Sequence, residues 1–596
     1  MPDSAGIGNR VELLRSWLEA PNLQGDPGRR QQCHTELNQL RQLWQSNPAL
    51  FSTRTLRTLK NLADQLKNAQ LDTPKADIGG VHTVENQVSS AEQVLKTVFG
   101  YDTFRPGQKE IIEEVLTGRD AVGIMPTGAG KSITFQIPAR ILSGTVLVIS
   151  PLIALMKDQV DATTSLGFRA TFLNSSLTSE ERRARLERAA NGGYELIYAA
   201  PEGLEASVGY GLRGTALSLI AVDEAHCISH WGHDFRPAYR NLAGLKQRFG
   251  KIPILALTAT ATDVVTADII EQLGITKPAI YRGSFYRSNL KLFSLPKPGR
   301  QNRTGNVPPV KDAIAELVKA RAGESGIVYC LSRKSTDALA EHLRNHGIRA
   351  AAYHAGMESE ARNKVQDAFS RDDIDVVVAT IAFGMGIDKS NVRYVIHRDM
   401  PRSIEGYYQE IGRAGRDGLP SDCILFYSWS EVLAYDRFAS DASPEISERV
   451  RGQSREMFRF AEETGCRHQR LVGHFGTLMP ECGSSCDQCT PNDLFTEVIK
   501  PSSRKKGARK SLQAVQPRHS DSDGLFTELK ALRKELADEQ GVPAYIVFSD
   551  ATLREIAARH PVSIGEFLDV PGVGPHKLER YGGSFLDLLR RLPRDF

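Results

Sequence analysis

Short apolar runs alternate with amphipathic stretches through the middle of the chain, from Ala91 to about Tyr427. The runs have the composition of buried strands, and the stretches between them have helical spacing. Because strands that alternate with helices build parallel sheets covered on both faces, the pattern predicts two α/β domains in sequence. The expected strands are Ala121–Ile124, Val146–Ile149, Leu196–Ala199, Leu219–Val222 and Ile254–Leu257 in the first domain, and Ile327–Tyr329, Val376–Ala379, Tyr394–Ile396 and Ile424–Tyr427 in the second.

A segment rich in Pro, Gly, Arg and Asn, Tyr281–Gly305, marks the expected joint between the two α/β domains. Helical spacing continues outside them, and we expect residues 1–84 to form a small helical extension or a partner-docking module. Lys500–Arg518 holds seven basic residues and no acid, which is typical of a flexible linker. The predicted parts are therefore a helical extension (1–84), two α/β domains (85–284 and 285–432), a cysteine-rich region (433–495), a basic linker (496–522) and a small helical domain (523–596).

The composition is that of an ordinary soluble protein, with 41% hydrophobic and 24% charged residues among 596. A net charge of +4 neither requires nor excludes a nucleic-acid partner. The longest uncharged apolar stretch, Thr145–Met156, is too short to cross a bilayer and contains Pro151. The chain does not start with the pattern of a signal peptide. We therefore expect a cytoplasmic protein with no membrane partner, associated with the nucleoid if it binds DNA.

A glycine-rich segment, Met125–Ser132 (MPTGAGKS), follows an expected strand and precedes an expected helix. This is the context of a P-loop, in which backbone N–H groups wrap the phosphates of a nucleotide. We predict that Lys131 reaches the β- and γ-phosphates of ATP and that Ser132 is a ligand of Mg²⁺. The other expected phosphate contacts are Thr127, Gly128, Ala129 and Gly130.

Two carboxylates follow a second apolar strand, at Asp223 and Glu224. Phosphoryl transfer needs charge neutralisation and a positioned water more than it needs covalent chemistry. We predict that Asp223 holds Mg²⁺ through water and that Glu224 orients or deprotonates the attacking water. A mere pair of solvated turn residues is an implausible alternative so soon after a P-loop.

The second α/β domain contributes a loop of a different character, Tyr407–Gly418 (YYQEIGRAGRDG). Arginine stabilises phosphate charge through two parallel hydrogen bonds, and an arginine from another domain reaches the γ-phosphate when the two domains close. We predict this role for Arg413 and Arg416, with Gln409 beside them. ATP binding would then drive domain closure, the basis of a two-domain motor.

Together these motifs resemble those of superfamily 2 helicases, and the longer strings resemble the RecQ family of DNA helicases. The strings are DEAH at 223–226, TAT at 258–260, QEIGRAGR at 409–416 and ATIAFGMGIDK at 379–389. Met125 stands where the strict P-loop motif has Gly, as in the helicase variant of the loop. The resemblance implies two tandem RecA-like P-loop domains, followed by a small zinc-binding helical region and a C-terminal helical HRDC-like domain.

The resemblance also assigns residues beyond the phosphate site. It implies that Tyr101 stacks on adenine, that Arg105 and Gln108 contact it, and that Gly386 and Asp388 belong to the nucleotide site. The string that continues from the DEAH motif is similar to the family's aromatic-rich loop, with His230 where the family usually has Gln. Aromatic side chains just after the catalytic acids could stack on a DNA base, although a buried aromatic pair is the plain alternative. The expected DNA contacts in this loop are Trp231, Phe235 and Arg236.

Four of the eight cysteines crowd into one short segment, with the spacing C-x15-C-x3-C-x2-C. Four thiolates suit tetrahedral Zn²⁺, and the two short spacings are typical of zinc sites. The resemblance places a similar cysteine set after the second motor domain, with a first short gap of two residues. We expect a structural zinc site. His468 and His474 are alternative ligands that could take the place of a cysteine. The expected ligands are Cys466, Cys482, Cys486 and Cys489.

The C-terminal segment Leu525–Phe585 resembles the HRDC domain. A glycine turn that ends at Lys577 offers N–H groups and a cation to a DNA phosphate, and Tyr545 is expected to stack on a base or to pack in the core. Most family members place a winged-helix domain before HRDC. Here about 33 polar and basic residues separate Cys489 from Asp523, so a winged helix does not fit.

These inferences converge on an ATP-dependent 3′→5′ DNA helicase that uses ATP, Mg²⁺ and Zn²⁺, with a role in DNA recombination and repair implied by the family. The expected partners are single-stranded and forked DNA, together with single-strand-binding or repair proteins. The sequence leaves the oligomeric state open and favours a monomer. Two other functions stay open: an RNA helicase, and a DNA-binding or strand-annealing module that does not unwind.

Overall fold

The computed structural model describes residues 91–151, 153–205, 211–230, 234–297, 309–384, 389–440, 443–490 and 522–592, together with residues 10, 11, 36, 40, 55 and 58. The chain divides into two compact units, Met1–His82 and Thr83–Phe596. The six described residues of the first unit are helical, and Arg10 pairs with Glu36 at 2.5 Å. The helical expectation for residues 1–84 otherwise lies outside the described residues.

The first α/β domain is built on a seven-stranded sheet in the order β3-β4-β2-β5-β6-β1-β7, with every pair parallel. All five strands expected in this domain are buried along their expected length, as a sheet covered on both faces requires. The strands are β1 Ala121–Ile124, β2 Thr145–Ile149, β3 Ala170–Leu173, β4 Leu196–Ala199, β5 Leu217–Val222, β6 Ile254–Thr258 and β7 Ala279–Arg282.

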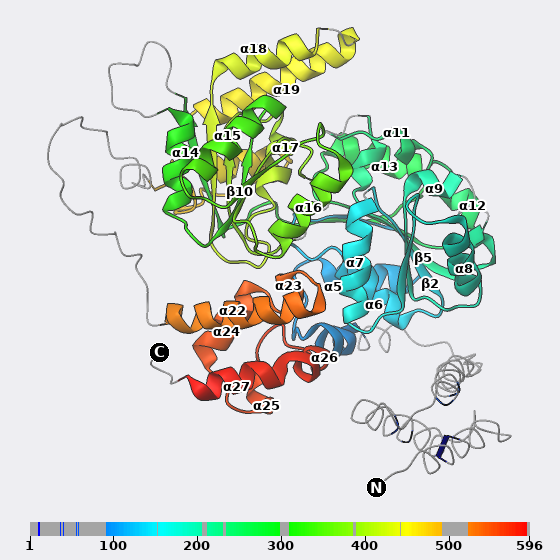
Figure 1. Ribbon diagram of the computed structural model, residues 1–596. Coiled ribbons are helices and arrows are strands. Elements are labelled where there is room, and N and C mark those ends of the chain that lie inside the picture. The colour runs from blue at the N-terminus through cyan, green and yellow to red at the C-terminus, as the bar shows by residue number, and fades with distance from the viewer. Residues whose placement is uncertain are drawn as a thin grey trace. The chain divides into compact units, whose positions relative to one another are not determined.

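Helices cover both faces of this sheet and give it two hydrophobic cores (Figure 1). Phe135 and Val160 lie in the core on one face, and Tyr239 and Val265 lie in the core on the other. The first face is covered by α5 Gln108–Leu116, α6 Ile133–Ile141 and α7 Ile153–Ser165, and the second by α8 Ser179–Ala190, α11 Pro237–Arg240, α12 Leu245–Phe249 and α13 Asp263–Leu273. Shorter helical segments are η3 Leu95–Phe99, α9 Pro201–Glu205, η4 Leu212–Gly214 and η5 Ala225–Ile228.

The second α/β domain has a six-stranded parallel sheet in the order β10-β11-β9-β12-β13-β8. The expected joint Tyr281–Gly305 contains β8, an edge strand of this sheet, so the described joint is the shorter turn between β7 and β8. The strands are β8 Leu290–Pro296, β9 Ser325–Tyr329, β10 Ala350–Tyr353, β11 Val376–Ala379, β12 Val392–His397 and β13 Ser421–Tyr427. The helices are α14 Val310–Lys319, α15 Arg333–Asn345, α16 Ser359–Ser370 and α17 Ile404–Ile411.

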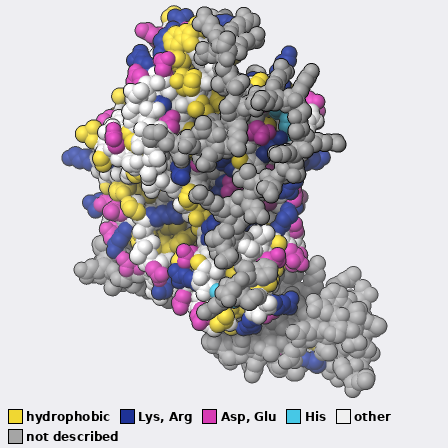
Figure 2. Space-filling view, turned by 90° about the vertical axis from the view of Figure 1, so that its left-hand side faces the viewer, with side chains coloured by type: hydrophobic (Ala, Val, Ile, Leu, Met, Phe, Trp, Pro, Cys, Tyr) yellow, Lys and Arg dark blue, Asp and Glu magenta, His cyan; other side chains and the backbone are white. Residues whose placement is uncertain are grey.

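A helical region follows the second sheet and packs on its edge strand β8. It consists of α18 Trp429–Phe438, α19 Pro444–Glu462 and α20 Arg467–His474. The α18–α19 hairpin leaves Leu433, Phe438 and Ile446 exposed to between 44% and 67%. Hydrophobic side chains gather at the top of the molecule in Figure 2, at the height that this hairpin has in Figure 1.

The described C-terminal residues form a helical domain with a hydrophobic core of its own. Phe548, Phe567 and Phe585 meet at its centre with ring centroids 5.1–6.3 Å apart. The helices are α22 Ser522–Gln540, α23 Ala544–Val547, α24 Asp550–Arg559, α25 Ile564–Leu568, α26 Pro575–Lys577, η7 Leu578–Gly582 and α27 Gly583–Arg591. Within the described residues, none of the helices is both long enough and apolar enough to cross a membrane.

Candidate nucleotide-binding site

The P-loop connects the end of β1 to the start of α6. Gly128 and Gly130 have φ values of 85° and 77°, the left-handed region that glycine adopts without strain. A Cβ on Gly130 would lie 2.5 Å from Nε2 of Gln108, so this position has no room for a side chain. The Nζ of Lys131 donates to the carbonyl of Met125 at 3.3 Å, which holds the ammonium inside the loop.

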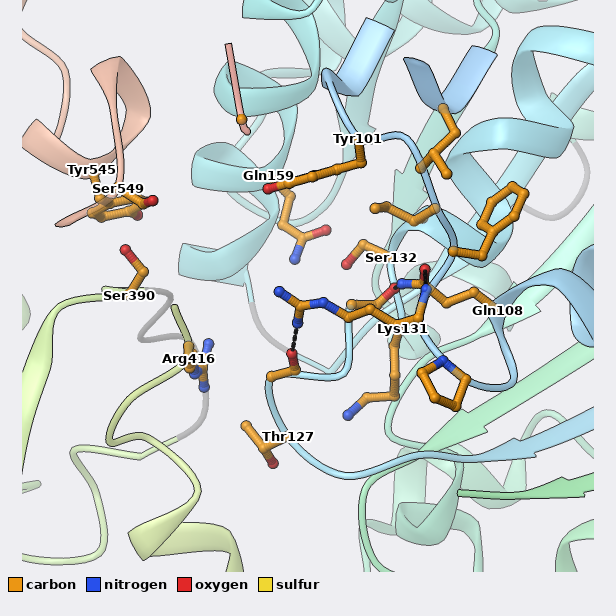
Figure 3. Close-up of a pocket in the computed structure, with 18 of the residues that line it drawn as sticks. Tyr101, Gln108, Thr127, Lys131, Ser132, Gln159, Ser390, Arg416, Tyr545 and Ser549 are labelled. Carbon is orange, nitrogen blue, oxygen red and sulfur yellow. Dashed lines mark hydrogen bonds between the residues drawn. The ribbon is translucent and has the colours of Figure 1, made fainter. Parts of the chain in front are cut away.

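Arg105 and Gln108 brace this loop from the segment that precedes α5. Nε2 of the buried Gln108 donates to the carbonyls of Ala129 and Gly130, each at 3.0 Å. The guanidinium of Arg105 donates to the carbonyl of Gly128, the dashed contact in Figure 3. Both side chains line the same cavity as Tyr101, which is 41% exposed. Oε1 of Gln108 also accepts from the backbone N–H of Arg105 at 2.9 Å, so the two residues hold each other as well as the P-loop.

The acid pair lies at the end of β5, at the same edge of the sheet as the P-loop. Strand β6 lies between β5 and β1, so the carboxyl ends of all three strands meet there. Glu224 has a φ of 48°, a conformation that few non-glycine residues adopt, and it begins a sharp turn into η5. The hydroxyl of Tyr239 donates to the carbonyl of Asp223 at 2.8 Å and fixes the backbone before this turn.

The histidine of the DEAH motif joins the acid pair to β6. The fully buried Nδ1 of His226 lies 2.9 Å from the hydroxyl of Thr258 and 3.4 Å from the carboxylate of Glu224. The same hydroxyl of Thr258 accepts from the backbone N–H of Thr260 at 3.2 Å. One imidazole ring therefore connects the Glu224 carboxylate to the TAT segment.

The arginine loop of the second domain faces the P-loop across one cavity of about 710 Å³. Gln409, Arg413 and Arg416 line it together with Lys131, Ser132 and the two acids. A Cβ on Gly128 would lie 3.5 Å from the Cα of Arg416, so the two loops are in near contact. Arg413 is 5% exposed and donates to the carbonyl of Gly384.

Arg287, in the turn between the two sheets, is a residue that the motifs did not identify. Its guanidinium donates to the carbonyl of Thr127 at 3.2 Å, and to those of Gly412 and Ala414 at 3.0 and 2.9 Å. Burial lowers its pKa. It therefore bridges the P-loop and the arginine loop. Its position in the sequence is the one feature that could have identified it, because Arg287 is a cation within the expected joint between the two domains.

The four clustered cysteines come together as expected, with all four Sγ atoms within 4.8 Å of one another. The Sγ atoms of Cys482 and Cys486 are 3.6 Å apart, close to the edge of a tetrahedron with a metal–sulfur distance of about 2.3 Å. Burial alone would raise the pKa of Cys466, but hydrogen bonds from backbone N–H groups, among them that of Cys482 at 3.2 Å, lower it. Burial raises the pKa of Cys482 and of Cys489 instead, so among these three thiols the thiolate form is favoured at Cys466 alone.

Neither histidine beside this cluster belongs to it. Nε2 of His468 lies 3.0 Å from the carbonyl of Leu290 and 3.1 Å from that of Ser485. His474 pairs with Glu405 and Glu456 at 2.9 and 3.0 Å. The structure thus leaves the four cysteines as the complete described ligand set.

The expected DNA contacts fall in two places. Trp231 lies outside the described residues, as do Gly386 and Asp388 of the nucleotide site. The ring of Phe235 contacts that of His230, with centroids 3.9 Å apart and planes tilted by 32°. Arg236 donates to Asp234 and to the carbonyl of Pro151 at 3.2 and 3.1 Å. Tyr545 and Lys577, from the C-terminal domain, line the nucleotide cavity.

Family models match most of this architecture. A DEAD/DEAH box helicase model matches residues 105–268, and a helicase conserved C-terminal domain matches 310–418. A RecQ zinc-binding model matches residues 430–490, and an HRDC model matches 522–589. The chain is 38% identical to the ATP-dependent DNA helicase RecQ of Haemophilus influenzae, with 84% of this chain and 96% of the relative covered.

The chain belongs to the RecQ family of ATP-dependent DNA helicases. A second relative, the ATP-dependent DNA helicase RecQ of Bacillus subtilis, is 35% identical, with 85% of this chain and 99% of that protein covered. Among solved structures, the Mycobacterium smegmatis helicase Lhr bound to single-stranded DNA and AMP-PNP has a TM-score of 0.46 and 19% identity, with 82% and 75% of the two chains covered. The two parallel sheets and the family matches confirm the α/β fold that the sequence predicts.

Proposed function

We propose that this RecQ-family member hydrolyses ATP with Mg²⁺ to move 3′→5′ along single-stranded DNA and to unwind duplex ahead of it. The observation that carries the proposal is the single cavity lined by the P-loop, the DEAH acids and the arginine loop of the other domain. Because the phosphate-binding and charge-stabilising groups come from two domains, hydrolysis must be coupled to their relative movement.

The roles proposed within this cavity follow from the chemistry of each group. Lys131 neutralises the β- and γ-phosphates, and Ser132 and Asp223 hold Mg²⁺. Glu224 activates the attacking water. Arg413 and Arg416 stabilise the charge that develops on the transferred phosphoryl group, and Gln409 positions it. Tyr101 is proposed to stack on adenine, while Arg105 and Gln108 hold the P-loop in shape as well as facing the base.

We propose that Cys466, Cys482, Cys486 and Cys489 bind one structural Zn²⁺. The spacing of their sulfur atoms and the thiolate-favouring contacts of Cys466 support a tetrahedral site with no open position. The metal would tie the start of α20 to the turn at Cys482–Cys489, which contacts strand β8 of the second motor sheet. Zinc would therefore stabilise the motor itself.

We also propose that the chain has no winged-helix domain between its zinc region and its HRDC domain. About 33 residues separate Cys489 from Asp523. The alignment with the Haemophilus protein is 604 positions long, which is more than 84% of this 596-residue chain can fill. The remaining aligned positions are residues of the relative that have no counterpart here. We propose the same division into a helical extension (1–84), two motor domains (85–284 and 285–432), a zinc region (433–495), a basic linker (496–522) and an HRDC domain (523–596).

DNA is proposed to contact the aromatic-rich loop through Trp231, Phe235 and Arg236. Forked DNA is the proposed substrate, in DNA recombination and repair, with single-strand-binding or repair proteins as partners and the nucleoid as the place of action. The close contact between the rings of Phe235 and His230 supports an aromatic surface in this loop, on which a base can stack.

Unwinding of labelled forks tests the function directly. The protein should open forked DNA with a 3′ tail in the presence of ATP and Mg²⁺, while a 5′ tail, an RNA fork or omission of ATP should give little product. Lys131→Ala serves as the inactive control. Equal unwinding of RNA forks would support an RNA helicase, and ATP-independent annealing without unwinding would support a DNA-annealing module.

A further inference from the structure

The nucleotide cavity has a third wall, which comes from the C-terminal domain. Its lining includes Tyr545, Ser549, Thr552, Gly572 and Lys577 in addition to residues of both motor domains. Figure 3 shows Tyr545 and Ser549 across the cavity from Gln108, beside Ser390 of the second motor domain. The C-terminal domain, which the sequence analysis expects to contact DNA, thus lines the candidate nucleotide cavity.

The glycine turn of this domain meets the first motor domain backbone to backbone. The N–H of Gly572, which has a φ of 87°, donates to the carbonyl of Gly100 at 3.3 Å. A Cβ on Gly100 would lie 2.8 Å from the carbonyl carbon of Val573, so the contact needs glycine on the motor side as well. Because Gly100 precedes Tyr101, the turn reaches the site at its expected adenine end.

Helix α22 holds the second motor domain at the turn after α16. The Nζ of Lys534 donates to the carboxylate of Asp373 at 2.7 Å and to the carbonyl of Arg371 at 2.8 Å. The guanidinium of Arg533 lies 3.7 Å from the carboxylate of Asp372. The C-terminal domain therefore contacts both motor domains at once.

A network of buried ion pairs around Asp372 lies at the contact between α22 and the second motor domain. Asp372 pairs with Lys389 as well as with Arg533, and both cations are 1% exposed. Burial alone would raise the pKa of Asp372, but the two cations lower it to about 2. Buried charges are costly unless they are paired, so this contact is built for a specific docked position. Lys389 is next to Ser390, which lines the nucleotide cavity.

Lys577 is the charged group that this domain brings to the cavity. Its Nζ lies 5.5 Å from the ring centroid of Phe548. Among the described residues it forms no ion pair with a carboxylate, and burial lowers its pKa to about 8. A half-buried cation without a counter-ion, placed at the wall of a nucleotide site, gains most from an anionic ligand.

We propose that the HRDC domain completes the nucleotide site, with Lys577 binding ATP and the Arg533–Lys534 segment holding the domain across both motor domains. ATP is then bound by three domains instead of two. The C-terminal domain becomes part of the nucleotide-responsive machinery, because opening of the motor cleft separates its two docking points. Lys577 serves the nucleotide and not the DNA.

Substitution of Lys577 by Gln in the full chain, which keeps most of the stem, tests the contact. The KM for ATP in DNA-stimulated hydrolysis should rise about tenfold or more, as expected for loss of one charge-assisted hydrogen bond. The affinity for single-stranded DNA without nucleotide should not change. Arg590→Gln is the matched control, since it removes one cation that pairs with Asp587 on its own helix. An unchanged KM would overturn the proposal, whether or not DNA binding weakens.

A charge swap tests the docked position without touching the cavity. Lys534→Glu and Asp373→Lys should each raise the KM for ATP about two- to fivefold, because each places like charges in contact. The double variant should restore the wild-type KM, as paired residues are not additive. A double variant no better than its worse parent would show that the two residues do not meet in the working enzyme.

Discussion

The guanidinium of Arg287 donates a hydrogen bond to the carbonyl oxygen of Thr127, 3.2 Å away in the P-loop. The same guanidinium donates to Gly412 and Ala414 in the arginine loop. Because Arg287 lies in the turn between the two sheets, the joint between the motor domains contacts both loops of the proposed active site. One side chain thus connects the P-loop to the arginine loop.

Arg287→Ala should therefore impair hydrolysis more than nucleotide binding. Misplacement of a catalytic group by about 1 Å can cost on the order of 100-fold in rate, so we expect a comparable fall in kcat with a small change in the Kd for ATP. DNA-stimulated ATPase and binding of a fluorescent ATP analogue measure the two. Arg282→Ala, which removes a nearby arginine that pairs with Asp263 on α13, is the control. A kcat within twofold of wild type would contradict the bridging role.

The central strands could be predicted from the sequence because they are buried on both faces. Ala121–Ile124, Leu196–Ala199 and Val376–Ala379 coincide with β1, β4 and β11. The edge strands β3 and β7 were not predicted because one side of each is solvated and polar residues interrupt the apolar run. Arg287 was not predicted because its role depends on carbonyl oxygens, which carry no sequence signature.

The motifs predict a phosphate site but not the contribution of the C-terminal domain to the cavity wall. Tyr545 and Lys577 were picked out as chemistry-bearing residues, yet their placement beside the P-loop depends on contacts between segments more than 400 residues apart in the chain. No local pattern encodes such a contact. The cysteine cluster differs, because four ligands within one short segment of sequence can be predicted to lie close together in the fold.

Hydrolysis should depend on both the P-loop and the DEAH motif of the first motor domain. Lys131→Ala removes the cation that holds the phosphates, and Glu224→Gln keeps the shape of the site but cannot accept the proton of the attacking water. We expect both variants to lose ATP turnover while they still bind single-stranded DNA. Measurable DNA-stimulated phosphate release by either purified variant would remove the catalytic assignment.

Loss of one cysteine of the cluster should cost both zinc and stability. Metal binding by four thiolates contributes directly to folding, so Cys486→Ser should give a zinc-poor and protease-sensitive protein. Cys330→Ser, which alters a buried cysteine of the second motor domain, is the control and should retain zinc. Atomic absorption measures the metal. Full zinc content in the Cys486 variant would mean that another group replaces the thiolate.

The zinc region should also carry a pH-dependent ion pair at His474. Burial alone would lower the pKa of His474, but its pairs with Glu405 and Glu456 raise it to about 9. A folded-state pKa above the unfolded value of about 6.5 stabilises the protein fully below pH 6.5, and this contribution disappears as the pH rises through 9. In buffers with excess zinc, Tm should fall over this interval.

His474→Gln should flatten that dependence. His346→Gln, which changes an exposed histidine at the C-cap of α15, should leave the slope as in the wild type. Scanning calorimetry at a series of pH values between 6 and 9.5 makes the comparison. Parallel curves for wild type and His474→Gln would show that the ion pairs do not stabilise the fold.

The proposed absence of a winged helix makes a prediction about substrate choice. A motor that walks on one strand parts a duplex when something blocks the other strand, and in the family that wedge is a hairpin of the winged helix. The described residues that remain are the zinc region, with its exposed α18–α19 hairpin, and the second motor domain. Neither has the form of a β-hairpin that could pry apart a blunt end.

The protein should therefore need a 3′ single-stranded tail and should open short forks far better than long or blunt duplexes. Stacking in DNA amounts to about 1.4 kcal/mol per step, so thermal fraying opens one or two pairs at a time and a translocating motor can capture them. Each added pair before dissociation lowers the yield, so the unwound fraction should fall steeply with duplex length. Gel assays on forks of increasing length, with a blunt duplex of equal length as the control, measure this. Efficient ATP-driven opening of a long blunt duplex by the protein alone would mean that another part of the chain acts as the wedge.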